Sequence, residues 1–120
     1  MPRYLLSVHS DRDPRPEPSN EAEMRASWER IMAVEEELRA AGVFKFGGRL
    51  EDPANAHVAR PVKHRVRMSD GPYAETKEML GGFYLIDADD EAAALSWAGK
   101  VAIAVGRPIE IRAFAAVSTD

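Results

Sequence analysis

Residues 68–86 read Met-Ser-Asp-Gly-Pro-Tyr-Ala-Glu-Thr-Lys-Glu-Met-Leu-Gly-Gly-Phe-Tyr-Leu-Ile, and this segment combines a bend, a charged stretch and an apolar run. Gly71 adopts a positive φ without steric cost, while Pro72 fixes its own φ and disfavours the helical region for the residue before it. The sequence therefore predicts a stiff bend at residues 70–72. Such a bend would hold the polar residues that follow it in a defined position.

The charged stretch after the bend leads into a core strand. Residues 75–78 are long enough for about one helical turn, and Gly81-Gly82 would end that turn with a left-handed residue. The apolar run from Phe83 to Ile86 then predicts a buried strand.

The segment before residue 68 predicts a strand, a helix, a second strand and a hairpin. Tyr4–Val8 is a β-rich apolar run that ends at His9. Residues 10–19 hold three alternating prolines, which favour an extended, solvated loop; this loop either has no role or acts as a lid over a cleft. Asn20 and Glu23 resemble a capping box, and a helix of about five turns would follow, up to Gly42. Its predicted apolar stripe comprises Met24, Trp28, Ile31, Val34 or Glu35, and Leu38.

A second strand is predicted at residues 43–46, and Gly47-Gly48 after it would mark a bulge or a close approach by another segment. Arg49 follows directly. Residues 51–55 form a turn cluster, and residues 57–62 and 65–68 predict a hairpin that bends near Lys63-His64.

The segment after residue 86 predicts a second helix and a last strand. Asp89 is the expected N-cap, and the helix would end at Gly106. Its apolar stripe is expected to comprise Leu95, Ala98, Ala102 and Val105. Residues 108–114 alternate between apolar and polar residues, as a strand does, and residues 117–120 are expected to fray.

This order of elements is typical of the α+β class. A βαββαβ chain with an inserted β-hairpin predicts a ferredoxin-like antiparallel sheet with both helices on one face. The other face of the sheet then needs a cover. The chain is short enough for a single domain over residues 1–120, and its high surface-to-volume ratio favours a homodimer.

Two motifs resemble a known family. Asp-Gly-Pro-Tyr-Ala-Glu-Thr-Lys-Glu at residues 70–78 and Leu-Gly-Gly-Phe-Tyr-Leu-Ile at residues 80–86 are similar to the signature of the DGPF branch of the YCII-related proteins. Tyr73 stands where the branch usually has Phe. The resemblance covers nearly the whole chain and implies a dimeric α+β barrel, in which two sheets pack face to face.

The resemblance does not supply a reaction. In YCII-related relatives, a His on the first helix and an Asp near the end of the second have been proposed as an acid–base pair. This sequence has no His between Glu21 and Ala40, and residues 99–103 contain no Asp. The DGPF branch has no settled activity, and its members often lie beside genes for alternative sigma factors, which implies a regulatory partner as one alternative.

Composition excludes several classes of function. The net charge is −4 with both signs interleaved, so nucleic-acid binding has no electrostatic footprint. No Cys is present, which removes disulfides, thiol nucleophiles and thiolate metal sites. No apolar run is long enough to span a bilayer, and the first residues do not resemble a signal peptide. We expect a cytoplasmic protein that does not associate with membranes.

The candidate site residues gather around the bend. Asp70 and Glu75 are the candidate acid–base residues, since paired carboxylates in a cleft can divide the two roles. His9 is a third candidate, because it ends the first strand. The candidate ligand-binding residues are Arg49, Tyr73, Lys77 and Glu78. In the alternative interpretation Asp70 accepts backbone hydrogen bonds in its own turn and the Glu and Lys side chains face water.

No metal or cofactor is expected. His9, His57 and His64 lack the helical spacing of a metal site. The glycine pairs do not fit a phosphate-binding loop, and no nucleophile-elbow or triad pattern surrounds the Ser and Thr residues.

Three functions remain open at this point. The leading hypothesis is a homodimeric small-molecule-binding or accessory protein with a cleft near residues 70–78. An alternative is a cofactor-independent isomerase or lyase, in which Asp70 or Glu75 takes a proton and Arg49, Lys77 or His9 stabilises the oxyanion. The third is a regulatory partner of an alternative sigma factor.

Overall fold

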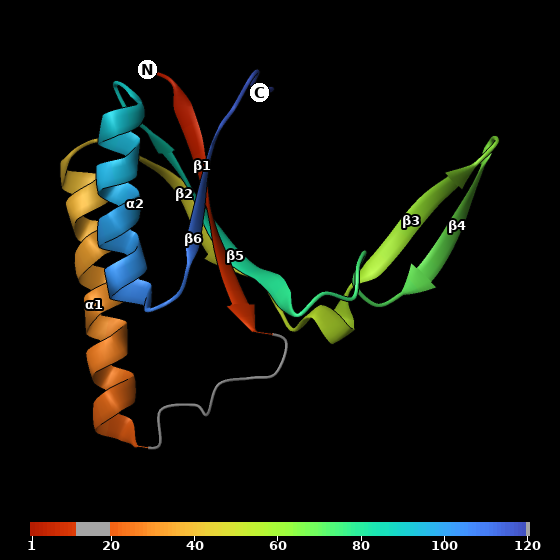
Figure 1. Ribbon diagram of the computed structural model, residues 1–120, viewed down its shortest axis with the longest axis horizontal. Coiled ribbons are helices and arrows are strands. Elements are labelled where there is room, and N and C mark those ends of the chain that lie inside the picture. Colours follow the sequence, from red (N-terminus) through yellow and green to blue (C-terminus); the bar gives the residue numbers. More distant parts are fainter. Residues whose placement is uncertain (12–19, 120) are drawn as a thin grey trace.

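The computed structural model describes residues 1–11 and 20–119, and it has two helices and two antiparallel sheets (Figure 1). The elements are β1 (Arg3–Asp11), α1 (Glu21–Ala40), β2 (Phe44–Arg49), the 3-10 turn η1 (Pro53–Asn55), β3 (His57–Val62), β4 (Arg65–Asp70), β5 (Glu78–Asp87), α2 (Glu91–Val105) and β6 (Ile109–Ala113). The predicted α+β class is confirmed, and the arrangement is compatible with a ferredoxin-like fold.

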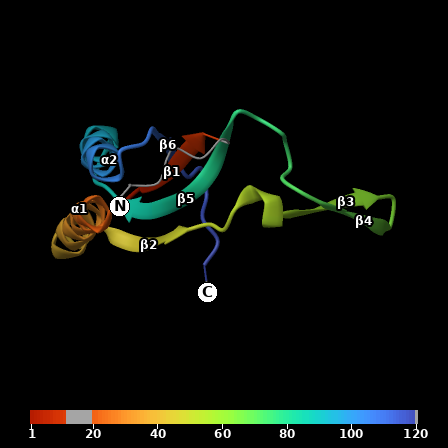
Figure 2. The same cartoon turned by 90° about the horizontal axis from the view of Figure 1, so that it is seen from below.

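The main sheet has the strand order β2-β5-β1-β6, with every neighbouring pair antiparallel. Both helices cover one face of this sheet, and no helix of the described residues lies over the other face (Figure 2). The predicted hairpin is present as β3 and β4, inserted between β2 and β5 as a separate sheet of two strands.

The core lies between the helices and the covered face of the sheet. Leu6, Leu38, Ile86 and Val101 are fully buried there. They come from β1, α1, β5 and α2, so all four central elements depend on the same apolar cluster. On β6, Ile109 and Ile111 pack against this cluster, which turns the alternating residues of that strand toward the open face.

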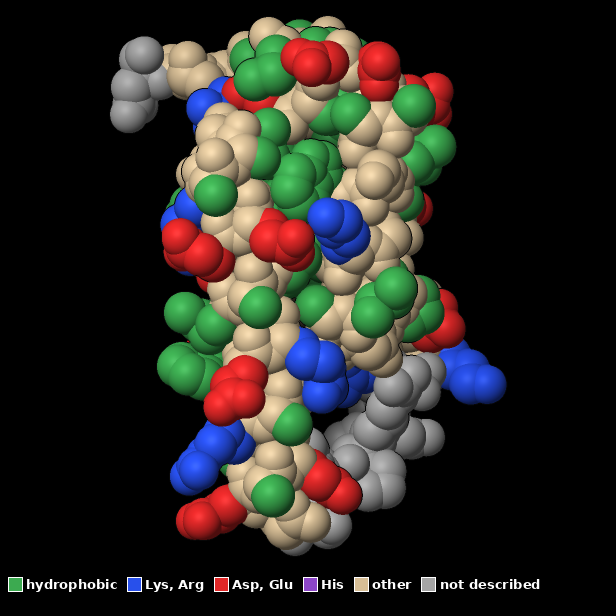
Figure 3. Space-filling model, turned by 90° about the vertical axis from the view of Figure 1, so that its left-hand side faces the viewer, with side chains coloured by type: hydrophobic (Ala, Val, Ile, Leu, Met, Phe, Trp, Pro, Cys, Tyr) green, Lys and Arg blue, Asp and Glu red, His purple; other side chains and the backbone are tan. Residues whose placement is uncertain are grey.

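Helix α1 begins as the capping pattern predicts, because Asn20 Oδ1 accepts the backbone N–H of Glu23 at 2.8 Å. Beyond its C-cap, Gly42 has a φ of 74°. Its outer face carries interspersed acidic and basic side chains, with apolar side chains in the seam beside α2 (Figure 3).

The predicted apolar stripe of α1 is correct only in its second half. Val34 and Leu38 are buried, whereas Met24 and Trp28 are exposed. The physical reason is the length of α1. Its N-terminal turns extend beyond the end of α2, so α2 does not cover them (Figure 1).

Helix α2 begins one residue later than predicted, and its predicted stripe is confirmed at Ala98, which is buried, and at Val105, which packs against the core. The N-cap is Asp90, which accepts the Ala93 N–H at 2.8 Å, rather than Asp89. The buried residues are Ala94, Ala98, Val101 and Ala104, while Leu95 is exposed. Small side chains let the helix lie close to the sheet, so the alanine face turns inward. The predicted end of the helix is confirmed by the left-handed Gly106.

The charged stretch after the bend forms no helical turn, which corrects the prediction for residues 75–78. Strand β5 already starts at Glu78, which pairs with Asp11 of β1. This strand pairing gives the backbone N–H and C=O groups their hydrogen-bond partners. Gly81-Gly82 therefore lies inside a strand and ends no helix. The pairing steps from Val8–Gly82 to His9–Leu80, which leaves Gly81 as the extra residue of a bulge.

Strand β1 also runs further than predicted, so that Ser10 belongs to it rather than to the proline-rich loop. The proposed lid, apart from the strand residues 10 and 11, lies outside the described residues. Residues 114–119 form no helix or strand. Neither described helix combines the length and apolarity needed to cross a membrane.

Candidate functional site

Two glycine pairs meet where β2 lies beside β5. Gly47 pairs with Tyr84, and Gly82 pairs with Arg49. A Cβ on Gly47 would lie 2.5 Å from the Tyr84 ring, and a Cβ on Gly82 would lie 2.6 Å from the Gly48 carbonyl oxygen. Both distances are too short for a side chain, so only glycine fits. The predicted close approach at Gly47-Gly48 is therefore confirmed.

These glycines help to build a groove of about 770 Å³ beside the exposed N-terminal turns of α1. Gly47, Gly48, Gly81 and Gly82 all line it, and we call it the glycine groove. Helix α1 contributes Glu23, Met24, Ser27, Trp28, Ile31 and Glu35 to its lining. Its volume falls within the range of small-molecule sites. The exposed fraction of Trp28 is 62%, so an indole ring is available to a ligand.

A partly buried hydrogen bond joins two residues that line the groove, Tyr84 and Glu35. The Tyr84 hydroxyl donates to Glu35 Oε2 at 2.7 Å, and Arg39 pairs with Glu35 Oε1 at 3.2 Å. Burial raises the pKa of Tyr84 well above its usual value, and the hydrogen bond to the Glu35 carboxylate and its negative charge raise it further. Tyr84 therefore keeps its proton, and Arg39 compensates the charge of Glu35.

Two cations of the groove lack such compensation. Arg49, at the end of β2, and Arg107, just after α2, both line the groove. Neither guanidinium group has a hydrogen-bond or ion-pair partner among the described residues, whereas Glu35 is paired and Glu23 also takes part in an interaction. Among the residues that the structure describes, no carboxylate neutralises these two positive charges of the groove.

A second cavity, of about 520 Å³, lies beside the bend, and we call it the loop cleft. It brings together His9, Tyr73 and Glu78, three of the predicted site residues. The Arg60 guanidinium lies 5.5 Å from the centroid of the Tyr73 ring. Leu50, Pro53, Pro72, Met79 and Leu80 make much of the remaining lining apolar.

The other predicted acid–base residues lie outside both cavities. Asp70 ends β4, its side chain is 93% exposed, and its Oδ1 lies 2.9 Å from Nδ1 of His57 across the hairpin. Glu75 and Lys77 are exposed and line neither cavity. The predicted bend itself is present, since Gly71 has a φ of 100° and its N–H donates to the Ala56 carbonyl at 2.7 Å.

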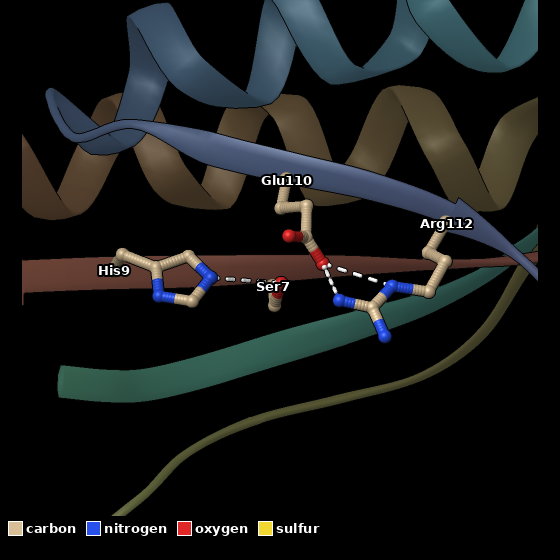
Figure 4. Close-up of polar contacts among 4 residues, drawn as sticks. All are labelled: Ser7, His9, Glu110 and Arg112. Carbon is tan, nitrogen blue, oxygen red and sulfur yellow. Dashed lines mark hydrogen bonds and ion pairs between the residues drawn. The ribbon is translucent and has the colours of Figure 1, made fainter.

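The open face of the sheet carries polar pairs of its own. Ser7 Oγ lies 3.1 Å from His9 Nε2, and Arg112 donates two hydrogen bonds to Glu110 Oε1 at 2.7 and 3.1 Å. Figure 4 shows these four side chains on β1 and β6, on the side away from the helices. His9 thus faces the uncovered side of the sheet.

Sequence reasoning missed most of the glycine groove. Glu35 was expected only within α1, as an alternative to Val34 in its apolar stripe, and it is half-buried there and forms an ion pair with Arg39. Tyr84 was expected in the strand, and Arg107 was not considered. The available signal was the pair of Gly-Gly dipeptides, because two strands without side chains on one face leave a hollow where they pair.

No group of three or more potential metal ligands occurs in the part of the chain that the structure describes. A family model described as the YCII-related domain matches residues 13–106. No curated protein matches the chain.

Proposed function

This chain belongs to the YCII-related family, and from that premise we propose that it is a homodimer that binds an anionic small molecule in the glycine groove. The observation that carries the proposal is the presence of Arg49 and Arg107, without carboxylate partners among the described residues, in a groove of about 770 Å³. A carboxylate or phosphate would supply the missing acceptors, because guanidinium groups bind such anions through paired hydrogen bonds.

The apolar part of the groove narrows the class of ligand. Met24, Trp28 and Ile31 line it from one helix, and the glycine-rich strands line it without large side chains. An aromatic ring could stack on Trp28 while its acid group reaches an arginine. The proposed ligand is therefore an aromatic or otherwise apolar carboxylate rather than a bare inorganic anion.

The dimer is supported by surface area. A compact monomer of 13.3 kDa is expected to expose about 6,400 Å². This chain exposes 8978 Å². The difference, roughly 2,500 Å², is large enough for one subunit's share of an obligate homodimer interface. The open face of the main sheet, including Phe46 and Phe83, is the surface that we propose a second copy covers.

A binding or accessory role is favoured over the isomerase or lyase alternative. A general base must lie within hydrogen-bond reach of its substrate. Asp70 lies in solvent, and His9 and Arg49 line different cavities, so the described protomer does not bring the required groups together. The loop cleft with His9, Tyr73 and Glu78 remains a second candidate surface for a ligand.

Trp28 provides a direct test. In a Trp97→Phe background, Trp28 is the single tryptophan of the chain, and its fluorescence reports on the groove. We expect 1-naphthoate to quench or shift this emission with saturation, and the neutral 1-naphthalenemethanol to bind at least tenfold more weakly. A hydrogen bond to a charged group contributes about 1.5–3 kcal/mol, and 1.4 kcal/mol is about tenfold in affinity.

Variants locate the site. Arg49→Gln and Arg107→Gln are each expected to weaken 1-naphthoate binding about tenfold or more. The control Arg25→Gln, on an exposed residue of α1 that does not line the groove, should leave it unchanged. Tyr73→Ala separates the two cavities: loss of binding in this variant, with Arg49→Gln and Arg107→Gln unaffected, would move the ligand to the loop cleft and contradict the proposal.

A further inference from the structure

The β3–β4 hairpin projects from the body of the protein on the side away from the helices (Figure 1). Among the strands that the structure describes, β3 and β4 pair only with each other. In the view of Figure 2 the helices lie on one side of the main sheet and the hairpin extends on the opposite side, where the open face is. A second copy that covers the open face would therefore lie alongside this hairpin.

The pairing register divides the hairpin into two chemically different faces. Ala59 pairs with Met68 and Pro61 pairs with Val66, so these four apolar residues share one face. The opposite face carries Arg60, Arg65 and Arg67, together with Val58 and Val62. Both Val66 and Met68 are 65% exposed. Within the described part of the protomer, this apolar stripe is therefore exposed.

An isolated two-stranded hairpin is at best marginally stable in water and needs a third layer against its apolar face. In this protomer the residues of β3 and β4 are almost all exposed. The hairpin nevertheless has a regular register over six residue pairs. We therefore expect the apolar stripe to pack against a surface outside its own protomer.

Charge favours a second copy as that surface. Residues 57–70 carry four basic residues and one acidic residue, although the whole chain has a net charge of −4. The body of the protein therefore holds the excess negative charge. Opposite net charges on hairpin and body favour the approach of the hairpin of one copy to the body of another.

We infer that the β3–β4 hairpin is a clasp, whose apolar face (Ala59, Pro61, Val66 and Met68) lies against the partner subunit of the homodimer. This inference rests on the proposed dimer. The residues Ala56 and Pro72, which join the hairpin to the rest of the chain, both line the loop cleft. Docking of the hairpin on the partner therefore also fixes the shape of that cleft.

Photo-cross-linking tests the contact directly. Benzoylphenylalanine replaces Val66 on the apolar face in one sample and Arg67 on the basic face in a second, and each variant is mixed with isotope-labelled wild-type chain to form mixed dimers. We expect position 66 to give cross-links between labelled and unlabelled chains, and position 67 to give far fewer. Cross-links from position 66 that stay within one chain would overturn the inference.

Sedimentation equilibrium separates this inference from the dimer itself. Val66→Ser combined with Met68→Ser is expected to raise the dimer dissociation constant at least tenfold, whereas Val62→Ser, on the other face, should change it less than twofold. Unchanged far-UV circular dichroism would verify that the body stays folded. If the wild type is a dimer and the double variant dimerises equally well, the clasp inference is contradicted and the proposed dimer stands. If the wild type is a monomer, both the clasp and the dimer are contradicted.

Discussion

Gly47 and Gly48 are neighbours in β2, yet the space around them differs sharply. A Cβ on Gly47 would lie 2.5 Å from a carbon of the Tyr84 ring, whereas a Cβ on Gly48 would meet nothing within 4 Å. Gly47→Ala is therefore expected to destabilise the protein by about 1–3 kcal/mol through overpacking. It should also push Tyr84 away from Glu35.

Urea denaturation of Gly47→Ala and Gly48→Ala measures this difference. We expect the midpoint of Gly48→Ala to stay close to that of the wild type, since the added methyl group has room. Equal midpoints for the two variants would show that the Tyr84 ring does not press against β2, and the steric explanation of the groove would be wrong.

Asp87, the last residue of β5, forms ion pairs with two cations, Arg3 and Lys45. Its Oδ1 accepts from Arg3 at 3.1 Å, and its Oδ2 lies 3.3 Å from Lys45 Nζ. Burial of Asp87 opposes ionisation, but the hydrogen bonds and charges of Arg3 and Lys45 outweigh it and hold the pKa of Asp87 below its usual value.

The sign of the pH effect follows from this lowered pKa. The carboxylate stabilises the folded state fully above the ordinary Asp pKa of 3.8, and this contribution is lost as the pH falls through the lower folded pKa. Asp87→Asn should cost about 1–3 kcal/mol near neutral pH. Its stability should fall less steeply than that of the wild type below about pH 4. Parallel acid-unfolding curves for the two proteins would contradict the role of this carboxylate.

At the residue scale, the sequence predicted backbone features better than side-chain neighbourhoods. Gly71 and Gly106 adopt the positive φ expected from their positions. The predicted acid–base residues Asp70, Glu75 and His9 do not lie in one cavity, because Asp70 lies at the end of a hairpin that projects from the body of the protein. Proximity in the sequence does not show whether residues lie together in space, because that depends on how the hairpin packs against the rest of the chain.

Helix α2 offers a prediction about capping. The sequence Asp89-Asp90 contains two possible N-caps, and the structure uses the second, which accepts the N–H of Ala93. Asp90→Ala should therefore lower stability by about 1 kcal/mol. Asp89→Ala should have a much smaller effect, because Asp89 accepts no hydrogen bond in the structure described. Thermal unfolding of both variants compares them, and a larger loss for Asp89→Ala would contradict the assignment.

Strands and helices were predictable where periodicity and caps agreed. The hairpin strand β3 has the predicted bounds, and Asn20 caps α1. The helical turn predicted for residues 75–78, with Gly81-Gly82 at its end, was wrong, because a Gly-Gly pair can either end a helix or allow two strands to approach closely. The choice depends on β2 and β1, which lie far away in sequence.

The dimensions of the molecule are larger than those of a compact domain of the same length. Its radius of gyration is 16.6 Å, whereas a compact domain of this length is expected to have about 14 Å. The projecting hairpin and the open sheet face both contribute exposed surface (Figure 2). A single copy therefore leaves more surface uncovered than a domain of 120 residues normally does.

The most direct test of this account is sedimentation equilibrium of the wild type beside two matched variants. Phe46→Asp places a charge on the open sheet face, where Phe46 is 55% exposed, and Ile103→Asp places one on α2, where Ile103 is 80% exposed. We predict a wild-type mass of twice 13.3 kDa, a monomer for Phe46→Asp and a dimer for Ile103→Asp. A wild type that stays monomeric at all concentrations, or a Phe46→Asp variant that dimerises like the wild type, would contradict it.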